Sequence, residues 1–512
     1  MSDTLLKFTS GGQSMGNWPD TFRINAWTGE KLMASNVSSK AKTWALRAML
    51  PETQTLLQVP SETDSADWRD PKVGWGLILA EREGLSEEEL ASGADAPEPI
   101  RALLKARGNA PVFRYRPDAV NRFTHLRNYA TGTDVSISNA PPGLAPNALP
   151  RYLLIYGSPA DIPWKLQYML NTTCSVGRLD LEGDALENYV QALLNDWKDA
   201  ATQVDRAVMW TVDFGAGDVS DLIRNALAVR VYASWQYDAT LQHNVLFLDG
   251  CVNQASSAAL ITALTQKRPA LIVTMSHGQA GPCSDPTTMK AKLGLPVDQD
   301  GQPLEIDQLL ASWEPDGAIW YAHACCSAGS ADSTLYGCLP LANPAICLVE
   351  GGSPIDQVLK GITGLGALTA PLPRALLGAK KPLRAFVGYV EPTFDWILQQ
   401  PATSQYLMEN IRQALCNNIY RPMPVGLAFR NFYKSLAQLC SEFEVAFNAY
   451  SRGEDTLSVA LYSQLAAREI QSMVILGDPT VMLRFNPKAG HEEDVDENLP
   501  LSFQSTRTSK SA

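Results

Sequence analysis

Short apolar runs alternate with longer stretches of helical period between residues 150 and 390. This alternation predicts a largely parallel sheet covered by helices, because parallel strands need helix-length connections between them. The runs are bounded by Gly or Asp and have no polar face, which is typical of strands buried on both faces. Strands are predicted at 152–156, 207–212, 244–248, 270–275, 318–322 and 383–387, and helices near 183–200, 218–229, 255–266, 305–313 and 372–378.

The first 150 residues are less regular. The stretch 75–80 predicts a buried strand and 99–105 predicts a helix. The Pro- and Gly-rich stretch 139–146 indicates a boundary. We therefore expect an N-terminal α/β region over 1–147. It is a regulatory or recognition domain, an additional half of the sheet, or an inhibitory segment, and the pattern leaves these alternatives open.

The C-terminal part of the chain has a different pattern of hydrophobic and polar residues. The stretches 427–450 and 456–473 have long amphipathic helical patterns, and a strand-like piece follows at 474–485. The last residues are acidic and then rich in Ser and Thr, which predicts disorder. The units expected after residue 147 are an α/β core (148–400), a helical flank with a final strand (401–486) and a disordered tail (487–512).

The composition is that of a folded globular protein. Of the 512 residues, 45% are hydrophobic and 19% are charged, which argues against a disordered, collagen-like or coiled-coil chain. The formal charge is −12, and Lys and Arg form no basic stripe. Because phosphate neutralisation needs clustered basic side chains, we expect no nucleic-acid partner.

Cysteine usage and hydropathy predict a cytoplasmic address. The nine cysteines have no repeating spacing and no CxxC pair, which argues against a disulfide framework and a structural zinc site. The N-terminus has neither a basic nor an apolar leader region, and no apolar run reaches the ~18 residues of a membrane span. We expect a reducing environment and no membrane partner.

Two predicted strands deliver reactive residues at their carboxyl ends, where ligands collect in open α/β sheets. The strand at 270–275 leads into Ser276-His277-Gly278, and the strand at 318–322 leads into His323-Ala324-Cys325-Cys326. A cysteine attacks as its thiolate, and a neighbouring imidazole promotes ionisation and returns a proton to the leaving group. If the two strands are neighbours, His277 and Cys325 lie at the same edge of the sheet.

These two strand ends resemble the caspase-like cysteine peptidases, which include caspases, gingipains, separase and bacterial CHAT domains. The interval of 48 positions (325 − 277) is close to the ~50 residues between His and Cys in caspases. The caspase signature Gln-Ala-Cys-x-Gly is absent. The nearer resemblance is to gingipain-like peptidases, because 152–163 resembles their first strand and turn, 175–179 their Val-Gly-Arg segment and 476–480 their Gly-Asp-Pro ending.

The resemblance implies a caspase-like or gingipain-like fold and roles for individual residues. His277 would be the general acid and base, Cys325 the nucleophile, and the backbone N–H groups of Gly278 and Cys325 the oxyanion hole. It implies no cofactor and no metal. Cys326 remains the alternative nucleophile, because adjacent side chains on extended backbone point to opposite sides and only one can face His277.

The sequence offers weaker candidates for the rest of the site. An acidic group beside the nucleophile would select basic side chains, and Asp332 and Asp285 are the candidates for such a specificity pocket. The sequence leaves open which group orients the ring of His277. The candidates are a backbone carbonyl, Asp249 and Asp180.

His323 lies two positions before Cys325 and shares its strand face. A metal site built from His323, Cys325 and Cys326 lacks an evident fourth ligand. His323 is therefore interpreted as a structural or pocket-lining residue.

The sequence thus predicts a cysteine endopeptidase that cleaves protein substrates through a thioester on Cys325. An intracellular peptidase must be restrained, so we expect activation by an upstream protease, an activating protein or a bound signal. The resemblance implies a role in bacterial stress or antiphage defence. The rival is a catalytically inactive binding or scaffold protein on the same fold, and acyl transfer to an amine is a third alternative.

Overall fold

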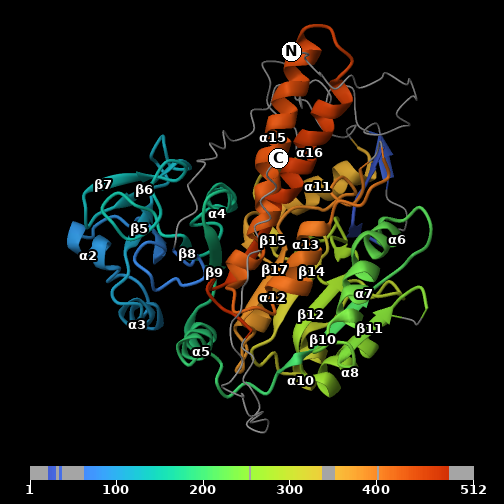
Figure 1. The fold of residues 1–512 in the computed structure, drawn as a ribbon, viewed down its shortest axis with the longest axis horizontal. Coiled ribbons are helices and arrows are strands. Elements are labelled where there is room, and N and C mark those ends of the chain that lie inside the picture. The colour runs from blue at the N-terminus through green and yellow to red at the C-terminus, as the bar shows by residue number, and fades with distance from the viewer. Residues whose placement is uncertain are drawn as a thin grey trace, which may run out of the picture.

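One sheet of 12 strands runs through the molecule, with helices packed along it (Figure 1). The computed structural model describes residues 21–29, 34–36, 63–252, 255–336, 352–400 and 403–483. The predicted tail 487–512 lies outside these residues. The strand order is β11-β10-β12-β14-β17-β18-β9-β8-β4-β5-β6-β7. Most neighbours in this order are parallel, so the predicted α/β fold with a mostly parallel sheet is confirmed.

The sheet consists of two parallel blocks that run in opposite directions. The first contains β11 (Val245–Asp249), β10 (Gln203–Thr211), β12 (Pro269–Met275), β14 (Ile319–His323) and β17 (Ala385–Tyr389). The second contains β18 (Met473–Gly477), β9 (Ser175–Leu179), β8 (Tyr152–Tyr156), β4 (Trp75–Ala80) and β5 (Val112–Tyr115). The antiparallel pair β17 and β18 joins the blocks. The antiparallel strands β6 (His125–Asn128) and β7 (Thr133–Ser136) end the second block.

All six strands predicted between residues 150 and 390 are present, and β8 and β4 have the predicted bounds. Every residue of β12 and of β14 is buried, which explains why these runs have no polar face. The stretch 474–485 was predicted as one strand-like piece, but the strand β18 ends at Gly477. The backbone leaves the ladder at Asp478 and Pro479, since proline has no N–H to donate.

The helices cover the sheet and form a separate flank at the C-terminal end. Within the described ranges, those before residue 270 are α2 (Glu87–Ser92), α3 (Glu98–Ala106), α4 (Trp164–Asn171), α5 (Gly183–Leu194), α6 (Val219–Ile223), the π-helical turn η1 (Arg224–Ala228), α7 (Val229–Tyr237) and α8 (Ser257–Lys267). Those after it are α9 (Pro286–Lys292), α10 (Ile306–Ser312), α11 (Pro354–Gly364), α12 (Pro371–Leu377), α13 (Glu409–Gln413), the π-helical turn η2 (Ala414–Asn418), α14 (Val425–Ala428), α15 (Arg430–Ser451) and α16 (Leu457–Ser472).

The long helices α15 and α16 lie side by side and form the predicted helical flank (Figure 1). The helix predicted near 218–229 is the start of a longer unit, in which α6, η1 and α7 follow one another. Among the described residues, no helix has both the length and the apolar character that a membrane span requires.

The N-terminal region takes part in two separate structures. Strands β4 to β7 extend the main sheet, because β4 pairs with β8 across the predicted boundary at 139–146. Upstream of them, β2 (Ala26–Trp27) pairs with the short strand β13 (Gly278–Gln279), which directly follows His277. The other strands in the described part of the chain form two small pairs, β1 (Thr21–Arg23) with β3 (Ala34–Asn36) and β15 (Gly329–Ser330) with β16 (Leu368–Thr369).

Candidate active site

Strands β12 and β14 are neighbours and bring His277 and Cys325 level with each other. Their last paired residues are Met275 and His323, an offset of 48 positions (323 − 275), and the same offset relates His277 to Cys325. Gly278 then packs on the Cys325 backbone, where a Cβ atom would overlap the Cys325 carbonyl oxygen. The close approach of the two strand ends therefore needs a residue without a side chain at position 278.

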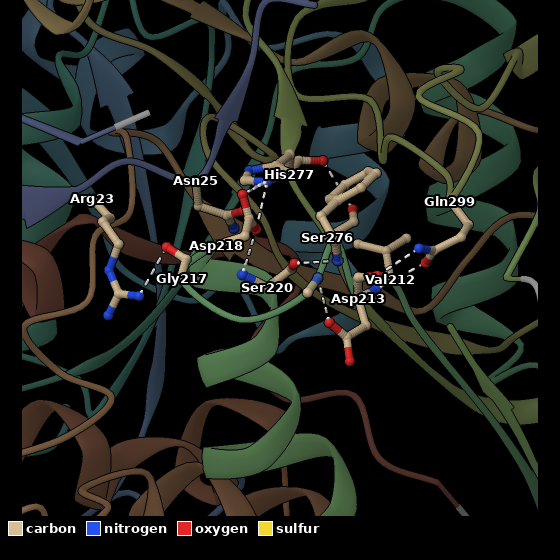
Figure 2. A network of polar contacts seen from close by, with 12 residues as sticks. Arg23, Asn25, Val212, Asp213, Gly217, Asp218, Ser220, Ser276, His277 and Gln299 are labelled. Carbon is tan, nitrogen blue, oxygen red and sulfur yellow. Dashed lines mark hydrogen bonds and ion pairs between the residues drawn. The ribbon is translucent and has the colours of Figure 1, made fainter. Parts of the chain in front are cut away.

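Asp218 holds the ring of His277 (Figure 2). Its two carboxylate oxygens lie 3.0 and 3.2 Å from Nε2 of His277. Asp218 is the N-cap of α6 and also accepts the backbone N–H of Ser220 at 2.8 Å. Since α6 follows β10, three adjacent strands of the sheet, β10, β12 and β14, supply a carboxylate, an imidazole and a thiol at one edge.

The carboxylate of Asp218 fixes the tautomer of His277. Burial alone would raise the pKa of Asp218, but the hydrogen bond and charge of His277, together with Ser220, hold this pKa well below its usual value. An ionised carboxylate only accepts hydrogen bonds, so Nε2 carries the proton. Nδ1 is buried and has no hydrogen-bond partner in the described part of the chain. It is therefore the ring nitrogen that can take up a proton.

Cys325 lies beside the loop that follows β17. The backbone N–H of Thr393 donates to Sγ at 3.1 Å, and Sγ lies 3.6 Å from the Thr393 carbonyl oxygen. Burial raises the pKa of Cys325 to about 12, although hydrogen bonds from Thr393 and the backbone of Asn25 act in the opposite direction. The thiol is therefore protonated at neutral pH, and within the described chain no hydrogen bond joins it to His277.

Cys326 has a different environment from Cys325. Its φ of +53° places it in the left-handed region, which residues with a side chain seldom adopt. Burial raises its pKa well above the usual value, and the charges of Cys325 and Glu391 add to this. Its backbone N–H donates to the carbonyl of Glu391 at 3.2 Å. Cys326 thus lies toward Glu391, whereas Cys325 lies toward Thr393.

Residues 23–27, the cleft segment, lie across this site. The N–H of Gly278 donates to the carbonyl oxygen of Asn25 at 3.0 Å, and the N–H of Asn25 donates to the carbonyl oxygen of Thr393 at 2.9 Å. The predicted oxyanion-hole donor of Gly278 thus already binds a peptide carbonyl.

The ring of Trp27 closes the site together with Phe214. The centroid of the His277 ring lies 5.8 Å from that of Trp27 and 5.4 Å from that of Phe214, and the two aromatic rings stack at 5.0 Å. The N–H of Ala280 donates to the Trp27 carbonyl at 3.0 Å, which fixes the strand pairing. As a result, His277 is 3% exposed and Cys325 is fully buried.

The two predicted specificity residues are both exposed, and their role stays a prediction. Asp285 is exposed and caps α9 by accepting the backbone N–H groups of Thr287 and Thr288. Asp332 is exposed and lines a cavity of about 770 Å³ that Glu391 also lines. The acidic side chain that meets the cleft segment is Asp395, which sequence reasoning missed.

Asp218, and neither Asp249 nor Asp180, orients His277. Asp249 is paired with Arg224, whose Nη2 lies 2.6 Å from its carboxylate, and the backbone carbonyl of Asp180 accepts a hydrogen bond from Arg374. The sequence does contain a signal for Asp218. It stands at the N-cap of the helix predicted near 218–229, in the loop that follows the strand predicted at 207–212.

His323 is fully buried, as expected of a structural residue. Its Nδ1 lies 3.1 Å from the hydroxyl of Tyr321, and burial lowers its pKa to about 3. Its backbone carbonyl accepts the N–H of Ser276 at 3.2 Å and so ties the ends of β12 and β14 together. Among the described residues, no three His, Cys, Asp or Glu side chains gather as ligands of a metal ion.

The site thus combines a thiol, an imidazole oriented by a carboxylate, and a backbone N–H that binds a peptide carbonyl. These are the components of nucleophilic acyl chemistry with general acid–base assistance. Comparison of the chain with family models and with curated proteins finds no match.

Proposed function

We propose that this chain is a caspase-like cysteine endopeptidase in which Cys325 is the nucleophile and His277 the general acid and base. The observation that carries the proposal is the arrangement at one sheet edge. Adjacent strands supply Asp218, His277 and Cys325, and an extended peptide lies across them with a carbonyl on the N–H of Gly278. A peptide carbonyl in this position is what an endopeptidase must bind.

His277, Cys325 and Gly278 have separate roles in the proposed reaction. Nδ1 of His277 takes the thiol proton, and the thiolate of Cys325 attacks the peptide carbonyl carbon to form a C–S bond. The N–H of Gly278 stabilises the resulting oxyanion. When the C–N bond breaks, His277 returns the proton to the leaving amine. Water then hydrolyses the thioester and regenerates the thiol.

Asp218 acts on this reaction through His277. When the ring takes the thiol proton it becomes an imidazolium, and the carboxylate 3.0 Å from Nε2 stabilises that charge. Without the carboxylate, the buried imidazolium would lack a counter-charge. Asp218 is therefore a positioning residue.

The rival function is an inactive binding or scaffold protein. The observation in its favour is that the Cys325 thiol is fully buried, which raises its pKa, and that among the described residues no hydrogen bond joins it to His277. The two functions differ in whether the thiol reacts once the cleft is open. A scaffold needs no reactive thiol, whereas a peptidase does.

The test is labelling of the purified full-length protein with peptide acyloxymethyl ketones that carry Arg, Lys, Asn, Asp or Leu at the reacting end. Intact mass gives the extent of labelling before and after limited proteolysis. We expect one label, lost in Cys325→Ala and His277→Ala and retained in Cys326→Ala. Labelling lost in Cys326→Ala but retained in Cys325→Ala would overturn the assignment. No labelling in any state would favour the scaffold.

A further inference from the structure

Arg23 binds the acidic side chain that lies beyond Thr393 in the same loop. Its Nε lies 3.0 Å from Oδ2 of Asp395. Its Nη1 lies 3.2 Å from the carbonyl oxygen of Gly217, and Figure 2 shows this second contact. The Asp395 side chain is only 8% exposed, whereas that of Arg23 is 29% exposed. Oδ1 of Asp395 has no hydrogen-bond partner among the described residues. A buried carboxylate is costly unless a cation is paired with it, and Arg23 is the cation that pairs with Asp395 here.

The side chain of Asn25 enters a second buried position. It is fully buried, and its Nδ2 lies 3.5 Å from the carbonyl oxygen of His323. Its Oδ1 has no hydrogen-bond partner in the described chain. Ile24 and Ala26 are each 1% exposed. The four consecutive side chains from Ile24 to Trp27 are therefore buried, although their backbone does not pair with any strand of the main sheet.

The hydrogen bonds fix how the cleft segment lies relative to the reactive groups. The Asn25 carbonyl accepts from the N–H of Gly278, the predicted oxyanion-hole donor, so Asn25 corresponds to the residue that carries the reacting carbonyl of a bound peptide. Arg23 lies two residues before that carbonyl and reaches Asp395. This is the manner in which an extended peptide binds to a strand edge, with main-chain bonds for affinity and side-chain positions for selectivity.

We infer that the cleft beside His277 and Cys325 binds extended peptides with a basic side chain two residues before the reacting carbonyl, and that residues 23–27 occupy it as an internal pseudosubstrate. This inference rests on the proposed function. Asp395 is the specificity-determining residue, and its pair with Arg23 retains the segment.

The internal segment competes with any peptide for the same groups. It occupies the N–H of Gly278, the carbonyl of Thr393 and the carboxylate of Asp395. An incoming peptide can form these contacts only after the segment has left. The segment therefore lowers the apparent affinity of substrates by the fraction of molecules in which the cleft is open.

The first experiment measures access to the thiol without peptidase chemistry. The full-length protein and its variants are treated with iodoacetamide, and peptide mapping gives the alkylation rate of Cys325 relative to the exposed Cys251. Arg23→Glu places two carboxylates together and should raise the relative rate roughly tenfold or more. Arg421→Glu, at an exposed arginine away from the cleft, should leave it unchanged. The double variant Arg23→Glu/Asp395→Arg should restore slow alkylation.

The second experiment measures side-chain preference. Two acyloxymethyl ketones, Ac-Arg-Ile-Asn and Ac-Glu-Ile-Asn, are compared in the Arg23→Glu protein. The arginine probe should label Cys325 roughly tenfold faster, because it places a cation on Asp395. Asp395→Asn in the same background should abolish this preference. Circular dichroism confirms that each variant retains its fold.

The two experiments separate failure of the inference from failure of the proposed function. If alkylation of Cys325 is unchanged in Arg23→Glu, the segment does not close the cleft and the inference is overturned. Equal labelling by both probes overturns the role of Asp395. If Arg23→Glu exposes Cys325 to iodoacetamide but neither probe labels it, the segment does cover the cleft and the peptidase proposal fails.

Discussion

Nε2 of His277 lies 3.0 Å from Oδ1 of Asp218, and both side chains are almost fully buried. Asp218 is held in place by its own role as the N-cap of α6. The orientation of the His277 ring therefore depends on the first turn of α6. A short loop links this turn to β10, the strand next to β12. This connection makes the carboxylate a fixed part of the site.

We expect Asp218→Asn to lower kcat by roughly 10²- to 10⁴-fold with little change in KM, because the imidazolium loses its counter-charge. The acid limb of the pH–rate profile should shift to lower pH, since the ring is then more easily deprotonated. Initial rates with the best peptide substrate, measured across the pH range in the Arg23→Glu background, check both effects.

Asp221→Asn is the matched control, because Asp221 lies on the same helix and contacts Asn225. It should leave kcat and the pH profile unchanged. Equal losses in both variants would indicate that helix α6, and not the carboxylate at His277, determines the rate.

The sequence predicted the sheet well because its signal is local. Each buried strand is a short apolar run, so β8 and β4 were placed to the residue. The juxtaposition of His277 and Cys325 was predicted on the condition that their strands are neighbours, and the pairing of β12 with β14 meets this condition. The direction of β18 was not predictable, because an apolar run does not specify whether it pairs parallel or antiparallel.

The remaining parts of the site depend on contacts between distant residues. The pairing of β2 with β13 joins residues about 250 positions apart, and nothing within residues 23–27 specifies that partner. Asp395 was missed because its significance comes from Arg23, which lies 372 positions away. Asp332 and Asp285 were chosen for their nearness in sequence to the reactive residues, and their role in specificity stays a prediction.

Glu391 should make the stability of the fold depend on pH. Burial raises its pKa to about 7, although Thr334 and Leu335 donate hydrogen bonds to the carboxylate. The unfolded value is about 4.3. Between these two values the folded state binds a proton that the unfolded chain has lost, so this group lowers the free energy of unfolding as pH rises to about 7. Above that pH its effect is constant.

Glu391→Gln removes this titration and resembles the protonated form. We expect the stability gain of the variant over the wild type to be roughly 2 kcal/mol larger at about pH 8 than at about pH 5.5. Urea unfolding at both pH values measures the gain. Glu444→Gln, at an exposed position, should show no such pH dependence. A gain that is equal at both pH values would contradict the prediction.

The Val-Gly-Arg and Gly-Asp-Pro segments meet where β9 pairs with β18. A Cβ atom on Gly177 would overlap the carbonyl oxygen of Gly477 and lie 2.9 Å from Cδ of Pro479. Gly177→Ala should therefore lower the free energy of unfolding by roughly 2–3 kcal/mol, because two backbone segments must move apart. Guanidinium unfolding checks the value.

Gly364→Ala is the control for Gly177→Ala. Gly364 lies in α11 with no atom within 4 Å of an added Cβ, so alanine should stabilise the helix by up to about 1 kcal/mol. If both variants have the same effect, the close approach of β9 and β18 does not limit residue size at position 177.

Asp478 joins the N-terminal part of the sheet to its central strands. Its carboxylate accepts the indole N–H of Trp75 at 3.0 Å and lies 3.4 Å from Nη2 of Arg107, whose side chain is 7% exposed. Asp478→Ala leaves that guanidinium buried without its counter-charge and should cost roughly 3–5 kcal/mol. Arg107→Met in the same chain should recover part of the loss, because it removes the uncompensated charge. Urea unfolding of the single and double variants measures the coupling, and additive losses would show that Arg107 does not depend on Asp478.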